Sequence, residues 1–269
     1  MSNNFNDILT VLDTINKEVT VPVYIPSLNR EVKFKSISTG QQKSLLKAAV
    51  DNPVFQTRFT IAFYNLVQEN CIEKDILPHL TTIDSAAIAV QLRISTTGAE
   101  YVISQNGRKF KVNLASVVEN FKAVKNINPD TVTEPPFTVQ VGVPLFVEQY
   151  NIEKQLREKT VNDQQVMSAQ LTETIGDAFI GEVSKFIKGI VVFYNNQEQQ
   201  VDYSTLSYTK KHTLLEKMPS TVIKSVLKYM EKYVNTQKDI LTISGIDTET
   251  DVTNNDLVLV IDSSLFIVS

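Results

Sequence analysis

The sequence predicts an α+β fold in which β-hairpins are each followed by amphipathic helices, so that small mixed sheets pack on helices. Residues 20–37, 100–114 and 189–203 each alternate apolar and polar positions on both sides of a turn. Behind each hairpin, apolar residues recur at helical spacing. Thr39 can cap the first of these helices, and Ser207 or Thr209 the last. The repeated order of hairpin and helix therefore predicts the α+β class.

The first hairpin and its helix occupy residues 20–50. Pro22 and Pro26 cannot donate to a ladder, so the first strand is predicted to be an edge strand or irregular. Thr39, with Gln42 three residues later, matches a capping box and predicts a helix start.

The second hairpin has the strongest turn signal of the chain, Asn106-Gly107. A helix from Thr82 or Asp84 to Gly98 is predicted ahead of it. The alternation places Phe110 on the inward face here and Phe193 on the inward face of the third hairpin. We therefore expect both phenylalanines to be buried.

Residues 126–136 read NINPDTVTEPP, with three prolines and no periodicity, and predict a linker. Residues 137–143 then alternate strictly and predict a strand. The end of the chain, LVLVIDSSLFIVS, is rich in β-branched residues and predicts a strand that its own sheet or another subunit must cover. The acidic residues between 247 and 256 predict a solvated loop.

These segments predict five regions along the chain. They are an N-terminal amphipathic arm (1–19), a hairpin–helix domain (20–125), the linker (126–136), a second α+β domain (137–240) that contains the hairpin 189–203, and a β-rich C-terminal tail (241–269).

Composition and charge narrow the class of protein. The chain has 269 residues, 42% hydrophobic and 21% charged, which is typical of a folded protein. Its net charge of −4 argues against a nucleic-acid partner, which would require a basic surface. A lone cysteine, Cys71, excludes an internal disulfide and fits a reducing compartment. The sequence shows neither a secretion signal nor a window of about 18 apolar residues, so we expect no membrane insertion.

Motifs for nucleotide and calcium binding fail at their key positions. Gly176 and Gly181 have the separation of a P-loop, but Glu182 stands where lysine is needed, and its carboxylate would repel phosphate. Residues 247–251 resemble the start of a calcium loop, but the required glycine and the bidentate glutamate are replaced by valines.

Catalytic and metal-binding patterns are likewise missing from the sequence. His79, His212 and Cys71 are too few for a zinc site without several carboxylates, and no Gly-x-Ser-x-Gly motif occurs. We therefore expect no catalytic residue, no metal and no cofactor, and a protein that is not an enzyme.

Partner contacts are the expected function of two apolar segments. The helix at residues 220–235 has apolar residues on two adjoining faces, which indicates either deep burial or a second face for a partner. Because tyrosine suits interfaces, we expect Tyr229 and Tyr233 to be partly exposed in the isolated chain and covered in the assembly. Val226 is a further candidate for partner binding on this helix.

The N-terminal arm is the second such segment. Phe5, Leu9 and Leu12 recur in it at helical spacing. The arm either packs on its own domain or docks on a partner.

Two stretches resemble a known family. In residues 21–49, a strand and a turn with Arg30-Glu31 precede the helical run STGQQKSLLKA. In residues 189–232, a hairpin ends in VDYSTLS, a helix ends at Pro219, and an amphipathic helix follows. Both stretches are similar to baseplate hub proteins of T-even-like contractile-tailed phages.

The resemblance implies a subunit of the tail baseplate hub, or a factor that assembles it in the host cytoplasm, without enzymatic activity. Its partners would be other baseplate or tail subunits, or a second copy of the chain. Two alternatives stay open: an assembly chaperone that is absent from the mature virion, and an enzyme with an unrecognised site.

Overall fold

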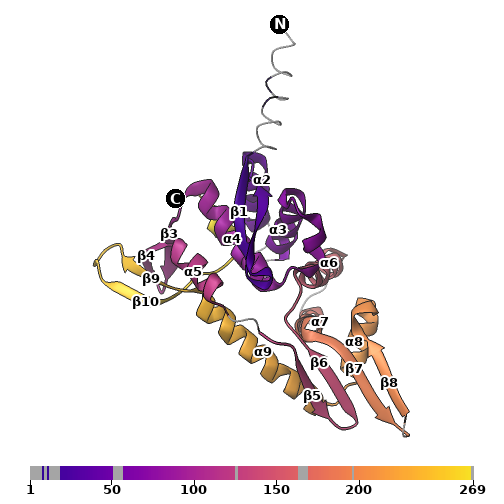
Figure 1. Ribbon diagram of the computed structural model, residues 1–269. Helices are drawn as coiled ribbons and strands as arrows, with labels where there is room; N and C mark the ends of the chain where they lie inside the picture. Colours follow the sequence, from indigo (N-terminus) through magenta and orange to yellow (C-terminus); the bar gives the residue numbers. More distant parts are fainter. Residues whose placement is uncertain are drawn as a thin grey trace. The chain divides into compact units, whose positions relative to one another are not determined.

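The computed structural model describes residues 8, 11, 19–50, 57–124, 127–162, 169–195 and 197–267 (Figure 1). They form two compact units: unit 1 draws on residues 1–124 and 238–269, and unit 2 on residues 125–237. In sequence, unit 2 is therefore inserted between two parts of unit 1. Both units contain antiparallel sheets and helices, which confirms the predicted α+β class.

This division differs from the expected one at two places. Residues 126–136 are not an irregular linker, because β5 (Asp130–Glu134) lies within them and pairs with β6 (Phe137–Val141). Residues 241–269 are β-rich as expected, but they belong to unit 1. Their first strand, β9 (Thr242–Asp247), pairs with β4 (Arg108–Asn113), so ladder hydrogen bonds hold the end of the chain in that unit.

The first hairpin pairs β1 (Thr20–Ile25) with β2 (Arg30–Lys35) as a separate two-stranded sheet. The connection is a 3-10 turn, η1 (Pro26–Leu28), that ends at Asn29 with a φ of 50°. A helix side chain completes the edge of β1: Tyr24 N donates to Gln91 Oε1 at 2.8 Å, and Gln91 Nε2 donates to Tyr24 O at 2.9 Å. The predicted edge position of β1 is thus confirmed.

The helices of unit 1 are α2 (Thr39–Val50), α3 (Thr57–Asn70), α4 (Thr82–Thr97) and α5 (Ala115–Ala123), with the 3-10 helix η2 (Lys74–His79) between α3 and α4. The caps lie one residue earlier than predicted. Thr81 caps α4 in a capping box with Asp84, and Ser38 rather than Thr39 exchanges hydrogen bonds with Gln41 at the start of α2. The reason is geometric, because an N-cap must precede the first helical residue.

A four-stranded sheet and the end of the chain complete unit 1. Its order is β10-β9-β4-β3, where β3 is Glu100–Gln105 and β10 is Thr253–Val258. The expected strand at the C-terminus ends at Val258, and residues 263–266 form the 3-10 helix η4 (Ser263–Phe266). Phe266 is 1% exposed and lies 6.3 Å from Phe59 between ring centroids, so unit 1 itself covers this segment. Residues 253–256, expected in an acidic loop, belong to β10.

Unit 2 contains the sheet β5-β6-β7-β8, in which β7 is Ile187–Tyr194 and β8 is Gln197–Asp202. Its helices are α6 (Phe146–Asn162), α7 (Ala169–Phe186), α8 (Tyr208–Glu216) and α9 (Ser220–Leu241), and the 3-10 helix η3 (Tyr203–Thr205) precedes α8. The last residues of α9 belong to unit 1. Ser207 caps α8, as one of the two predicted alternatives, by accepting from Lys210 N.

The tyrosines of α9 lie in the core of unit 2. Tyr229 is 5% exposed and Tyr233 4%, and Val226 is completely buried. Both tyrosine rings meet Phe186 edge to face, at centroid distances of 6.3 and 5.2 Å, and Tyr229 Oη donates to Asn128 O at 3.2 Å. The expectation that these tyrosines are partly exposed is therefore wrong. The wide apolar surface of α9 reflects deep burial.

Phe193 also differs from its expected position. Phe110 is 6% exposed, as predicted, but Phe193 is 52% exposed. Ile190 faces the core at 1% exposure, and a residue three positions further along a strand points to the opposite face. Phe193 therefore lies on the outer face of the sheet, opposite Glu198 of β8.

Because Phe110 is buried and Phe193 is exposed, truncation to alanine should affect stability unequally at the two positions. Phe110→Ala should lower the free energy of unfolding by ~3–5 kcal/mol, because it leaves a cavity in unit 1. Phe193→Ala should change it by less than ~1 kcal/mol, since the ring is largely in water. Urea denaturation followed by circular dichroism measures both. Equal losses would contradict the assigned faces.

The two tyrosines of α9 should be needed for folding. The double change Tyr229→Ser and Tyr233→Ser should unfold unit 2 or lower its stability by more than ~3 kcal/mol, since both buried rings lose their contacts with Phe186. Val234→Ser is the control on the same helix, because Val234 is 55% exposed. Thermal melting compares the variants, and a stable double variant would restore these tyrosines as surface residues.

Candidate functional site

A glutamate at the start of α6 faces a pocket of unit 2. Glu148 lies in the first turn of the helix and accepts from Leu145 N at 2.9 Å through Oε2. The same oxygen accepts from Lys188 Nζ at 2.6 Å. A carboxylate is favoured here, because the first turn of a helix has unpaired N–H groups and a positive dipole end. The two contacts hold the carboxylate in place.

Tyr203 lies behind the lining of the pocket and contacts two of the lining residues, Ser184 and Lys211. It follows β8 directly, is fully buried, and donates from Oη to Ser184 Oγ of α7 at 3.0 Å. Burial raises the pKa of the Tyr203 phenol, so the hydroxyl stays protonated and remains a donor. Asp202 just before it accepts from Ser204 N at 3.0 Å, and the hydrogen bond from the Ser204 hydroxyl lowers the pKa of Asp202.

Lys211 lies over Tyr203. Its Nζ is 5.0 Å from the centre of the ring, a cation–π arrangement. Burial lowers the pKa of Lys211, and the negative charges of Glu148 and Asp202 offset only part of that effect. Among the described residues, no carboxylate oxygen lies within ion-pair distance of Lys211. By contrast, Lys185 pairs with Glu182 at 2.7 Å and Lys188 with Glu148.

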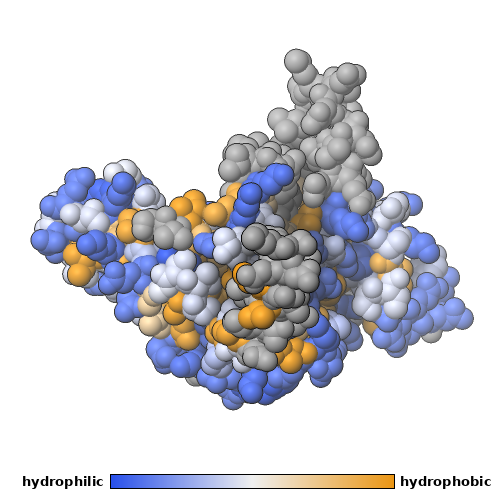
Figure 2. Space-filling view, turned by 90° about the horizontal axis from the view of Figure 1, so that it is seen from above, coloured by the Kyte–Doolittle hydropathy of each residue, from blue (hydrophilic) through white to orange (hydrophobic). Residues whose placement is uncertain are grey.

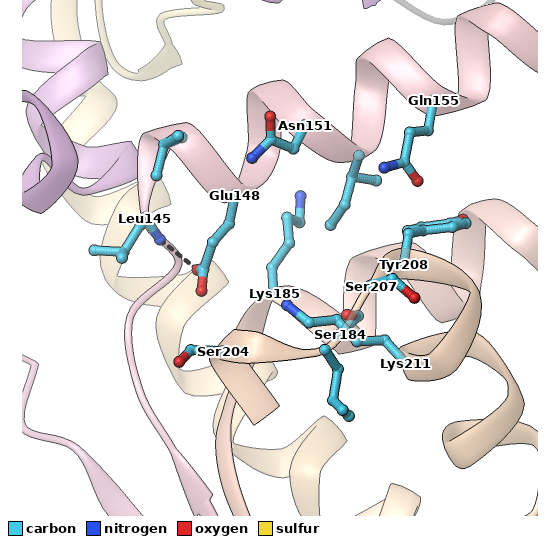
Figure 3. Close-up of a pocket in the computed structure, with 13 residues that line it drawn as sticks. Leu145, Glu148, Asn151, Gln155, Ser184, Lys185, Ser204, Ser207, Tyr208 and Lys211 are labelled. Carbon is cyan, nitrogen blue, oxygen red and sulfur yellow. Dashed lines mark hydrogen bonds between the residues drawn. The ribbon is translucent and has the colours of Figure 1, made fainter. Parts of the chain in front are cut away.

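These groups surround a pocket of about 390 Å³ between α6, the end of α7, and the segment from η3 to α8 (Figure 3). The side chains of Glu148, Lys185 and Lys211 extend into it from different elements. Its apolar lining consists of Leu145, Val147, Ile152 and Leu206. Its uncharged polar lining consists of Asn151, Gln155, Ser184, Ser204, Ser207 and Tyr208.

The serines of the pocket are committed to structural hydrogen bonds. Ser184 accepts from Tyr203, Ser204 donates to Asp202 at 2.5 Å, and Ser207 caps α8. The residues that line the pocket include no histidine and no cysteine. The cavity is partly apolar, and its lysine and amide side chains can donate hydrogen bonds. It therefore suits a polar group that is flanked by apolar ones.

His212, one of the two histidines, joins two helices next to the pocket. Its Nε2 lies 2.7 Å from Asp177 Oδ1 of α7, and its Nδ1 lies 3.4 Å from Glu216 Oε2 of α8. Burial raises the pKa of the neighbouring Tyr208 to about 12. Within the described part of the chain, no group of three or more His, Cys, Asp or Glu side chains is placed to hold a metal ion.

In the turn after β9, an acidic side chain accepts hydrogen bonds from the backbone. Asp247 is 3% exposed and accepts from Glu249 N at 2.8 Å and from Thr250 N at 3.2 Å. These backbone hydrogen bonds, that from Glu249 first, lower the pKa of Asp247. The acidic spacing that resembles a calcium loop thus forms a side-chain-stabilised turn.

The structure separates the six residues predicted to contact partners. Tyr229, Tyr233 and Val226 are in the core of unit 2. Phe5, Leu9 and Leu12 lie outside the described residues. Sequence reasoning missed Lys211 and the pocket, because the walls come from three separate segments, residues 145–155, 184–185 and 204–211, which no local pattern connects. The run VDYSTLS contains Tyr203, but no local pattern marks that residue as the support of a lysine.

Figure 2 shows hydrophilic residues over most of the described surface seen from above, with apolar residues in small groups among them. The exposed apolar side chains are scattered over several elements, with Ile246, Val252 and Val260 near the end of the chain and Phe193 and Tyr194 at the β7–β8 turn. No helix among the described residues is long and apolar enough to cross a membrane.

The buried hydroxyl of Tyr203 provides a test of how the pocket is supported. Tyr203→Phe should lower the stability of unit 2 by ~1 kcal/mol, because Ser184 loses its donor in a buried place. Tyr194→Phe serves as control, since Tyr194 is 65% exposed. Chemical denaturation measures both. An unchanged midpoint for Tyr203→Phe would show that this hydrogen bond does not support the pocket.

Comparison with known proteins places the chain in a family. The family described as T4 bacteriophage base plate protein matches residues 16–254, which include most of both units. No curated protein and no solved structure matches the chain. Because the match covers most of the chain, the protein belongs to the T4 bacteriophage base plate protein family.

Proposed function

We propose that the protein is a subunit of the tail baseplate hub, or a factor that assembles the hub, and that it acts through protein–protein interfaces without catalysis. The observation that carries the proposal is the family match over residues 16–254, which gives the chain a structural or assembly role in a phage baseplate. The hub assignment rests on the resemblance of residues 21–49 and 189–232 to hub proteins. Assembly would take place in the host cytoplasm.

The N-terminal arm supports a role in contacts with other baseplate subunits. Phe5, Leu9 and Leu12 recur at helical spacing. Ile8 and Val11, two described residues of this segment, are helical and expose 50% and 56% of their surface. Exposed apolar side chains gain free energy when a partner covers them. The arm is therefore the first contact segment that we propose.

The outer face of the unit 2 sheet supports a second contact. The register places Thr133 beside Thr138, Thr131 beside Gln140, and Phe193 beside Glu198 on this face. All but Thr138 are exposed. A mostly polar sheet face with an exposed aromatic ring resembles a non-obligate interface, where aromatic residues are enriched. We propose that another baseplate subunit covers it.

The non-catalytic part of the proposal is supported by the pocket of unit 2. Each of its serine hydroxyls makes a structural hydrogen bond, and its lining offers no histidine to activate them. The lining of the pocket therefore holds no serine paired with an activating histidine.

The test is the composition of phage particles and of their precursors. Quantitative mass spectrometry should find the chain in stoichiometric amount in hub intermediates purified from infected cells, and in mature virions if it is a structural subunit. A phage that lacks the gene should fail to complete its hubs. Presence in hub intermediates with absence from virions would identify an assembly chaperone. Absence from both would refute the proposal.

A further inference from the structure

One lysine of the unit 2 pocket lacks a direct ion pair. Glu148 pairs with Lys188 at 2.6 Å, and Lys185 pairs with Glu182 at 2.7 Å. Lys211 contacts the face of Tyr203, and among the described residues no carboxylate lies within ion-pair distance of it. The charges of Glu148 and Asp202 act on Lys211 only from further away.

The position of the Lys211 charge is costly in the absence of a ligand. Lys211 is partly buried, and burial lowers its pKa, which shows that its surroundings disfavour the charged form. A cation–π contact with Tyr203 recovers part of the lost hydration. An anion placed in the pocket would recover more, because charge-assisted hydrogen bonds are the strong ones.

The lining determines which kind of anion fits. Leu145, Val147, Ile152 and Leu206 make one part of the wall apolar, so the anion must be flanked by apolar groups. A phosphate carries a charge of about −1.5 to −2 at neutral pH. It would leave negative charge uncompensated near the Glu148 carboxylate, which also lines the pocket. A carboxylate carries one negative charge and matches the one lysine of the pocket that has no direct ion pair among the described residues.

We propose that this pocket binds an acidic side chain of a partner protein, with the carboxylate at Lys211 and neighbouring apolar residues against Leu145, Ile152 and Leu206. Asn151 and Gln155 extend into the same space and can donate amide hydrogen bonds to the main chain of the bound segment (Figure 3). The partner would be another baseplate subunit, so this identification of the ligand rests on the proposed function. The volume of about 390 Å³ suits a segment of a few residues.

The probe is the peptide acetyl-Leu-Glu-Leu-amide, titrated into the purified full-length chain and followed by methyl NMR. The signals of Leu145, Ile152 and Leu206 should shift and saturate, with a dissociation constant of about 1 mM or lower. Acetyl-Leu-Gln-Leu-amide should bind at least ~10-fold more weakly, since it has the same shape without the charge. Glutarate, the free dicarboxylate, should also bind more weakly, because it lacks the apolar flanks.

Variants of two adjacent lysines assign the effect to one side chain. Lys211→Met should abolish saturable binding while its unbranched stem still covers Tyr203, and Lys211→Arg should retain binding. Lys210→Met is the matched control, because Lys210 is exposed on the same helix. If Lys211→Met fails to fold, the Glu and Gln peptides still decide the question on the unchanged protein.

Three results would overturn the proposal. They are no saturable shift with the Glu peptide, equal binding of the Glu and Gln peptides, or equal loss of binding in the Lys210 and Lys211 variants. Tighter binding of glutarate than of the peptide would assign the pocket to a small dicarboxylate and would also refute a protein ligand. The titration uses purified protein, so it can fail while the chain is still found in the hub, and the two proposals are separately testable.

Discussion

The pairing of β9 with β4 is the contact on which unit 1 depends, because it joins two parts of the chain that are separated by the whole of unit 2. Val112 of β4 lies opposite Gly245 of β9, where an added Cβ would meet Val112 Cγ1 at 2.7 Å and Leu257 Cδ1 at 2.6 Å. A glycine is thus needed for the strands and side chains to approach so closely. The chain then continues to η4, whose Phe266 packs against Phe59. The free-energy cost of closing a long loop grows slowly with its length, so a whole unit can be inserted there.

In unit 2 a single tyrosine connects the sheet with the pocket. Tyr203 follows β8, donates to Ser184 in α7, and supports Lys211 of α8 with its ring. Its burial excludes water from the hydroxyl, and a hydrogen bond in such a place is costly to lose. Buried contacts in unit 2 therefore fix the helices that carry the pocket residues. A binding site built on packed elements keeps its geometry better than one on loops.

Aromatic residues of unit 2 lie in two different environments. The rings of Tyr229, Tyr233 and Phe186 pack on one another and stabilise unit 2. Phe193 of β7 is instead exposed to water on the outer, mostly polar face of the sheet. Under the proposed function, such a face is available to a partner subunit. The face seen in Figure 2 is mostly hydrophilic, with apolar residues in small groups.

Local signals in the sequence determined the α+β class, the three hairpins, the Asn106-Gly107 turn and the burial of Phe110. Each of these depends on periodicity or turn chemistry within a few residues, which the chain encodes by itself. The sequence also carried the family resemblance. Only the tertiary structure decided that residues 241–269 complete unit 1, that Tyr229 and Tyr233 are core, and that Phe193 is not. The pocket around Lys211 likewise appears only when α6, α7 and α8 are brought together. The reason is that burial and charge balance depend on which distant elements meet, and no local pattern contains that information.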